Sequence, residues 1–97
     1  MRVRSHPGAR RDLNHAVDWY IAEAGEPTAT RFVEEVERLR ALILGHPRIG
    51  APGRFDTRRV VFRSFPYTLV YRLRGDILEV IALAHHSRRP DYWTPRT

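Results

Sequence analysis

The sequence predicts an α+β fold: an N-terminal strand, then an antiparallel helical hairpin packed on a small antiparallel β-sheet with a C-terminal three-stranded meander. Two patterns predict this fold. Apolar residues recur every three or four positions between residues 9 and 43, and three short apolar or alternating runs follow between residues 59 and 84. The 97 residues, of which 42% are hydrophobic, suit one folded domain over residues 1–97.

Each predicted helix rests on an apolar stripe. The first stripe comprises Ala9, Leu13, Ala16, Val17, Tyr20, Ile21 and Ala24. The second comprises Phe32, Val36, Leu39 and Ile43, flanked by Ala29 and Val33. Gly25 is expected to end the first helix and Pro27 to begin the second, and this short link predicts an antiparallel hairpin. Glu34 and Arg38 are expected to pair across one turn of the second helix.

The strands are predicted from β-type runs bounded by turn residues. Met1–Ser5 forms the first strand, which ends before Pro7 because proline cannot donate to a ladder. The three strands of the meander are expected at residues 59–64, 68–73 and 77–84. In the middle run Leu69, Tyr71 and Leu73 share one face. One side of the sheet is therefore expected to pack on the helices and the other to carry arginines.

Composition excludes several classes of protein. The chain has no cysteine, which excludes disulfides and thiolate metal sites. No apolar run approaches the roughly 20 residues that span a bilayer, and the first residues lack the apolar core of a signal peptide. We therefore expect a cytoplasmic protein without a membrane partner.

Positive charge is concentrated in the second half of the chain. The net charge is +6, and all 17 basic residues are arginines. Residues 1–50 hold eight arginines and seven acids, whereas residues 51–97 hold nine arginines and four acids. The predicted strands and the C-terminal residues therefore carry the positive field, which attracts nucleic acid or an acidic protein segment. A basic nucleic-acid-binding module is one function class that this pattern allows.

The last predicted strand runs into titratable, cationic and aromatic residues between His85 and Trp93. His85 or His86 could transfer protons near neutral pH, or could serve as a strand cap or ordinary surface residue. Trp93 could contact a partner or fold back as a hydrophobic latch. Adjacent histidines on a strand point to opposite faces, and no third ligand lies at a familiar spacing. We therefore expect no metal site, and we expect no cofactor.

Short motifs occur in a particular order along the chain. They are Asp12-Leu13 with Ala16, Trp19 and Tyr20; His46-Pro47 with Gly50; Arg58-Arg59; Phe65-Pro66-Tyr67; Val70-Tyr71; and His85 with Arg88, Pro90, Tyr92 and Trp93. In order and spacing they resemble the RelE/ParE superfamily of bacterial type II toxins, and the resemblance covers nearly the whole chain. It implies a growth-inhibiting toxin, of the kind linked to plasmid stabilisation, that a cognate antitoxin binds and neutralises in a hetero-oligomer.

The resemblance implies one of two activities. ParE-like members poison DNA gyrase, whereas RelE-like members cut messenger RNA in the ribosome. Cutting RNA needs a base, an acid and cations, for which the candidates are His85, His86, Arg63, Arg88 and Tyr92. The candidates for contact with the target are Arg59, Arg63, Arg72, His86, Arg88, Arg89, Tyr92 and Trp93. The candidates for contact with the antitoxin are Trp19, Arg59 and Arg63.

Departures from the nuclease pattern favour the ParE-like branch. Ribosome-dependent nucleases of the superfamily usually carry an arginine in the strand position of Thr68, and many use lysines, which this chain lacks. Tyr92-Trp93 with Arg96 is more similar to ParE-like members. We therefore expect a gyrase-poisoning toxin that is not an enzyme. The alternatives are a ribosome-dependent endoribonuclease and a nucleic-acid-binding or antitoxin-binding module without toxicity.

Overall fold

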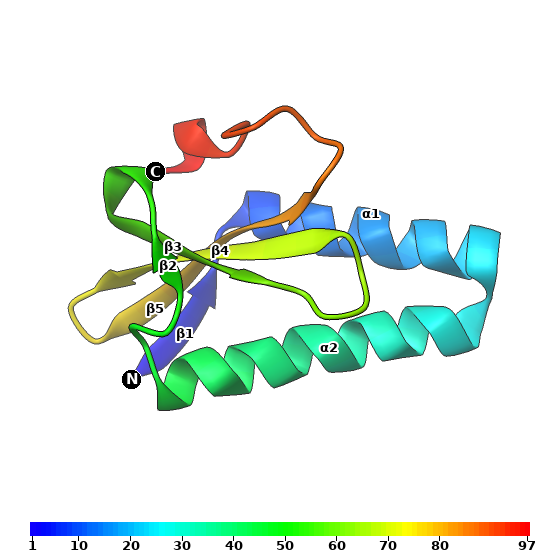
Figure 1. Ribbon diagram of the computed structural model, residues 1–97, viewed down its shortest axis with the longest axis horizontal. Helices are drawn as coiled ribbons and strands as arrows, with labels where there is room; N and C mark the ends of the chain where they lie inside the picture. Colours follow the sequence, from blue (N-terminus) through cyan, green and yellow to red (C-terminus); the bar gives the residue numbers. More distant parts are fainter.

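The computed structural model describes residues 1–97, in which a strand precedes two helices and four further strands (Figure 1). The strands are β1 (Arg2–Ser5), β2 (Ala51–Pro52), β3 (Thr57–Val61), β4 (Tyr67–Arg74) and β5 (Ile77–His85). The helices are α1 (Pro7–Ala24) and α2 (Glu26–Gly45), and two 3-10 turns are η1 (Arg54–Asp56) and η2 (Thr94–Arg96).

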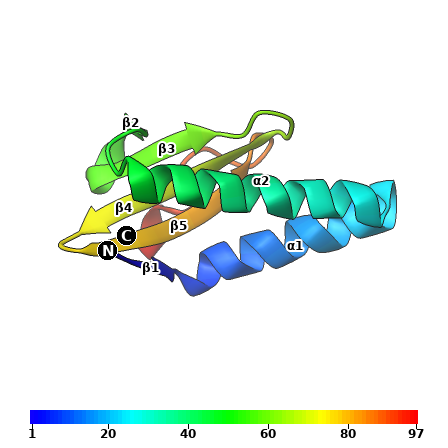
Figure 2. The same ribbon diagram turned by 90° about the horizontal axis from the view of Figure 1, so that it is seen from below.

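The strands form one five-stranded sheet in the order β1-β5-β4-β3-β2. β1 runs parallel to β5, and all other neighbouring strands are antiparallel. Both helices lie side by side on one face of the sheet, and the C-terminal residues lie behind its other face (Figure 2). The predicted α+β fold, with its helical hairpin and three-stranded meander, is confirmed.

The helical hairpin begins and ends close to the predicted residues. His6 caps α1, because its Nδ1 accepts the backbone N–H of Gly8 at 2.9 Å. Gly25 links the helices with a φ of 93°, which residues with a side chain rarely adopt. Neither helix combines the length and the apolar character that crossing a membrane requires.

Glu35 joins α2 to the hairpin between β3 and β4. The expected pair of Glu34 with Arg38 is wrong, because the Arg38 guanidinium donates two hydrogen bonds to Glu35, at 2.8 and 3.0 Å. The same carboxylate accepts the backbone N–H of Arg63 at 2.8 Å. Glu35 is the residue that faces the hairpin, whereas Glu34 is exposed, and the hydrogen bond from Arg38 lowers the pKa of Glu35.

Aromatic rings form the centre of the core between the helices and the sheet. The Phe32 ring is 0% exposed and stacks on Phe62, with 5.4 Å between the ring centroids. The Phe32 ring also meets Tyr67 at 5.0 Å, and Tyr20 meets Phe65 edge-on at 5.2 Å. Such pairs contribute about 0.5–1.5 kcal/mol each beyond the area they bury. These aromatic pairs attach the helical hairpin to the end of the sheet at which β5 finishes.

The first strand of the meander differs from its prediction of residues 59–64. β3 begins at Thr57 and leaves the ladder after Val61, where Phe62 turns into the core and donates its N–H to the carbonyl of Tyr67 at 3.0 Å. β2 pairs Ala51 with Arg59 and was not predicted, because a two-residue strand among glycines and prolines has no β pattern.

The outer face of the sheet carries a second, smaller core as well as arginines. The register shifts between Val70 and Tyr71, whose partners in β5 are Ala82 and Val80. This bulge leaves Ile81 without an opposite residue, so Ile81 and Ala82 both face outward. Val70, Ile81 and Ala82 pack against Trp93, which is 8% exposed. The structure thus makes Trp93 a latch for the C-terminal segment, residues 86–97.

Candidate functional site

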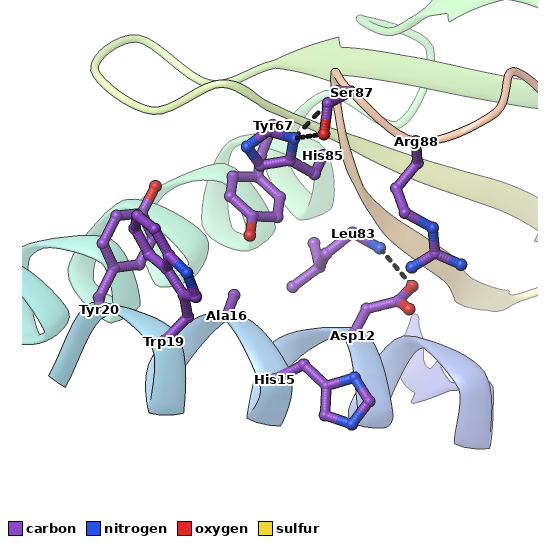
Figure 3. Close-up of a pocket in the computed structure, with 10 residues that line it drawn as sticks. All are labelled: Asp12, His15, Ala16, Trp19, Tyr20, Tyr67, Leu83, His85, Ser87 and Arg88. Atoms are coloured by element: carbon purple, nitrogen blue, oxygen red, sulfur yellow. Dashed lines mark hydrogen bonds between the residues drawn. The ribbon is translucent and has the colours of Figure 1, made fainter. Parts of the chain in front are cut away.

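Two clefts flank the C-terminal end of β5. The helix-side cleft, of about 420 Å³, lies between α1 and β5, and its lining includes Asp12, Ala16, Trp19, Tyr67, His85 and Arg88 (Figure 3). The outer cleft, of about 460 Å³, lies on the opposite face of the sheet, and its lining includes Arg54, Arg59, Thr68, His86, Arg89 and Trp93. His85 and Arg88 line both clefts, so they form the wall between them.

His85 ends β5 and is held by two neighbours. Its Nδ1 accepts the backbone N–H of Ser87 at 3.0 Å and lies 2.7 Å from the Ser87 hydroxyl. Its ring meets Tyr67 edge-on, with 4.9 Å between centroids (Figure 3). Because a backbone N–H can only donate, the bond to Nδ1 places the proton of the neutral ring on Nε2. His85 therefore has a defined structural role at the end of the strand.

His86 lies in the outer cleft. Its Nε2 lies 3.0 Å from the hydroxyl of Thr68 on β4, so these two residues form one polar group on the outer face. The side chain of His86 is exposed, whereas the neighbouring His85 packs on the helix side against Tyr67. The two histidines thus face different sides of the sheet, as their adjacent positions predict.

Asp12 is the centre of a polar network that no local sequence pattern predicts. Its carboxylate accepts the backbone N–H of Leu83 at 3.1 Å, the hydroxyl of Tyr92 at 2.9 Å and the guanidinium of Arg96 at 2.7 and 3.3 Å. Asp12 is 8% exposed, so these donors compensate the loss of water around the charge. One signal was present: Asp12 lies four residues before Ala16, within the apolar stripe of α1.

Tyr92 is bound on both its hydroxyl and its ring. The hydroxyl donates to Asp12, and the guanidinium of Arg88 lies 3.8 Å from the ring centroid. Burial and the charge of Asp12 raise the pKa of Tyr92 well above its usual range. The phenol therefore stays protonated at neutral pH and is not available as a base.

The predicted arginines separate into three groups. Arg59, Arg88 and Arg89 line the outer cleft, where they are joined by Arg54, which was not among the predicted residues. Arg72 pairs with Glu79 at 3.0 Å and lines neither cleft. Arg63 also lines neither cleft and lies on the hairpin that Glu35 holds.

Trp19 stands at the rim of the helix-side cleft. Its side chain is 58% exposed and meets the Tyr20 ring edge-on at 5.2 Å. The cleft beside it has Ala16 and Leu83 among its apolar lining and Arg88 among its cationic lining (Figure 3). An exposed tryptophan next to a hollow of mixed apolar and cationic character is a favourable anchor for a protein partner.

Three solved structures share the fold. A chain of the chromosomal ParDE TA system from P. aeruginosa aligns with a TM-score of 0.77 at 16% identity, over 88% of this chain and 95% of that chain. A chain of the intact E. coli RelBE toxin-antitoxin complex aligns at 0.62 and 21% identity, over 90% and 98%. The isolated E. coli RelE toxin aligns at 0.62 and 20% identity, over 97% and 93%.

Sequence comparison identifies the family. No curated protein matches the chain. The family model of the ParE toxin of type II toxin-antitoxin system, parDE, matches residues 3–90, which include both helices, strands β2 to β5 and all of β1 except Arg2. The predicted resemblance to the RelE/ParE superfamily is thereby confirmed, and the chain belongs to the ParE toxin family of type II toxin-antitoxin systems.

Proposed function

We propose that this chain inhibits growth by poisoning DNA gyrase and that a cognate antitoxin neutralises it. Four of the candidate catalytic residues, His85, His86, Arg88 and Tyr92, line the outer cleft, and the observation that carries the proposal is that contacts within the fold already occupy the reactive atoms of most of them. Tyr92 is bound to Asp12, and Arg63 lies outside both clefts. What remains at the end of β5 is a cationic surface, which is suited to binding.

The chemical requirements of RNA cleavage favour gyrase poisoning over nuclease activity. Attack of a 2′-hydroxyl on phosphate needs a base and an acid that both reach the reacting atoms. The Nδ1 of His85 already accepts a hydrogen bond from Ser87, and the raised pKa of Tyr92 removes the phenol as a base. Of the two histidines at the end of β5, only His86 is exposed, and its Nε2 contacts Thr68. One exposed histidine among arginines supports binding of an anion better than acid–base chemistry.

The match to the ParE toxin model over residues 3–90 supports the same choice of target. The RelE-like alternative, cleavage of messenger RNA in the ribosome, would need His86 as its central group. The two activities therefore predict opposite behaviour for a variant that lacks this imidazole.

The antitoxin is proposed to bind across the helix-side cleft. Trp19 offers an exposed aromatic anchor and Arg88 offers a cation, which together fit an amphipathic segment with acidic side chains. The similar chains from P. aeruginosa and E. coli come from ParDE and RelBE systems, which is consistent with a partner of this kind. Arg59 and Arg63 stay predicted antitoxin contacts on other parts of the surface.

Purified gyrase and purified ribosomes discriminate the two targets. With gyrase, ATP and supercoiled plasmid, the chain should trap cleaved DNA that appears as linear plasmid after protease treatment, and His86→Ala should retain this effect. With ribosomes and messenger RNA, neither protein should cut. Cleavage of ribosome-bound RNA that His86→Ala abolishes, with gyrase unaffected, would replace the proposal with the nuclease alternative. Adding the product of a neighbouring small acidic reading frame should suppress the gyrase effect.

A further inference from the structure

Positive charge gathers in the outer cleft. Arg54, Arg59, Arg88 and Arg89 all line it, and Asp91 is the only acid among its lining residues. Arg54 of η1 pairs with Asp91 of the C-terminal segment at 3.2 Å, so these two segments, which lie side by side in Figure 1, close one side of the cleft.

Most of this charge is unneutralised. No carboxylate lies within ion-pair distance of Arg59, Arg88 or Arg89, whereas Arg38, Arg72 and other arginines elsewhere have acidic partners. Guanidinium groups without a carboxylate partner keep their planar set of donors free for a phosphate or carboxylate ligand. A hollow lined by such groups attracts polyanions over several ångströms.

The cleft has a rigid base. The small core of Val70, Ile81, Ala82 and Trp93 lies beside it on the sheet, and the stacked Tyr92 ring positions the guanidinium of Arg88. A surface that is already ordered loses little conformational entropy when it binds a ligand. Arg59 is thus presented from strand β3, and Arg88 is presented from a ring whose hydroxyl Asp12 holds.

The aromatic residues of the cleft indicate which polyanion it fits. Proteins that hold single-stranded nucleic acid stack its bases on open aromatic faces. Here Trp93 is only 8% exposed, and Arg88 covers the ring of Tyr92. The cleft therefore offers contacts to backbone phosphates without a surface for unpaired bases, which is the requirement of a duplex.

We propose that the outer cleft binds the backbone phosphates of duplex DNA. The inference rests on gyrase poisoning as the proposed function, because gyrase acts on duplex DNA and the toxin would then contact the enzyme together with its bound DNA. Contacts to phosphates alone do not read sequence, so binding is independent of sequence and weakens steeply with salt.

The test measures binding of the purified full chain to a short fluorescent DNA duplex by anisotropy, without gyrase, between about 50 and 200 mM salt. The double variant Arg59→Ala/Arg89→Ala should bind about tenfold more weakly and reduce the salt slope by about 2, one unit for each lost phosphate contact. The matched control Arg10→Ala/Arg11→Ala removes the same charge from exposed positions of α1 outside both clefts, and should keep the wild-type slope. Circular dichroism establishes that both variants fold.

Three results would overturn the inference. Equal losses in the two double variants would mean that only net charge matters. Tighter binding of the single strand than of the duplex would mean that bases are contacted. Displacement of the duplex by a polyglutamate peptide at lower concentration than by unlabelled duplex would assign the cleft to an acidic protein segment. Because gyrase is absent from this assay, failure here leaves gyrase poisoning intact, and failure of plasmid cleavage leaves the DNA-binding result intact.

Discussion

The guanidinium of Arg96 donates to the carboxylate of Asp12 at 2.7 Å across 84 positions of sequence. This ion pair joins the first helix to the last residues of the chain, and both side chains are largely buried, at 16% and 6% exposed. Arg96 also donates to the carbonyl of Ile81 at 3.0 Å, so the same side chain holds β5. The C-terminal segment is thus attached to α1 and to the sheet, which keeps the wall between the two clefts in place.

Replacing Asp12 should destabilise the whole domain. Asp12→Ala leaves a buried guanidinium without its carboxylate and frees the donors of Leu83 and Tyr92, which should cost about 3–5 kcal/mol in the free energy of unfolding. Urea denaturation measures this loss. Glu37→Ala is the control, because Glu37 is 63% exposed, pairs with Arg40 at 3.5 Å and should cost about 0.5 kcal/mol or less. Similar losses in the two variants would contradict the assignment of Asp12 as the centre of the network.

Gly8 should be intolerant of a side chain. A Cβ at Gly8 would collide with the guanidinium of Arg96, which is held by Asp12 and cannot move without breaking the ion pair. Gly8→Ala should therefore destabilise by about 1–3 kcal/mol, as overpacking does. Gly45→Ala is the matched control at the end of α2, where no atom lies within 4 Å of the new Cβ, and it should be neutral or stabilise by up to about 1 kcal/mol. Thermal unfolding of the two variants compares them directly.

The helices and the meander were predictable because local periodicity carries the information. The stripe of Phe32, Val36, Leu39 and Ile43 is buried as its spacing requires. The bulge in β5 was not predictable, because residues 80–84 are apolar on both faces, so the pattern does not distinguish inward from outward positions.

The sequence predicted many of the residues that line the clefts, but few of the contacts between them. The residues after β5 do line two clefts, but the network around Asp12 depends on contacts between residues far apart in sequence. An aspartate in an amphipathic helix ordinarily faces water, and nothing local to Asp12 indicates Arg96 as its partner. Arg54 was missed for the same reason, since only the fold brings η1 beside Asp91.

Alkaline pH should weaken the attachment of Tyr92. Burial and Asp12 raise the pKa of the folded phenol, so this contribution to stability is complete below the unfolded pKa of about 10 and is lost as pH rises through the folded value. Tyr92→Phe should cost about 1.5–3 kcal/mol at neutral pH, where the hydroxyl donates to a charged acceptor, and less at pH above about 10. The difference in stability between the two proteins is measured from their urea midpoints across this pH range. This difference isolates Tyr92, because the raised pKa values of the buried Tyr20 and Tyr67 affect both proteins equally. A difference independent of pH would refute the assignment.

Phe55 should be replaceable with a gain in stability. It adopts a φ of 59° in η1, and this backbone conformation is strained for residues other than glycine, asparagine and aspartate. Its ring is 51% exposed. Phe55→Asn should therefore raise the free energy of unfolding by about 1 kcal/mol. Phe55→Leu keeps an apolar side chain and the strain, so it should show no gain. A loss of stability in Phe55→Asn would show that contacts of the ring, such as the Arg54 guanidinium at 5.2 Å, outweigh the strain.

Replacing the two tryptophans should affect stability to very different degrees. Trp93 fills the small core on the outer face, so Trp93→Ala should lose about 3–5 kcal/mol of unfolding free energy. Trp19 touches Tyr20 edge-on but is 58% exposed, so Trp19→Ala should lose only about 1 kcal/mol.

Trp19→Ala, which should cost little stability, should cost much of the affinity for the antitoxin. If Trp19 anchors the antitoxin at the helix-side cleft, Trp19→Ala should weaken the complex about 30-fold, the effect of removing a central aromatic contact. Titration calorimetry with the antitoxin measures this change, and Ile21→Ala, another exposed apolar position on α1 outside the cleft, is the control. Unchanged affinity in Trp19→Ala would move the antitoxin surface away from this cleft, because no other exposed tryptophan, tyrosine or phenylalanine lines it.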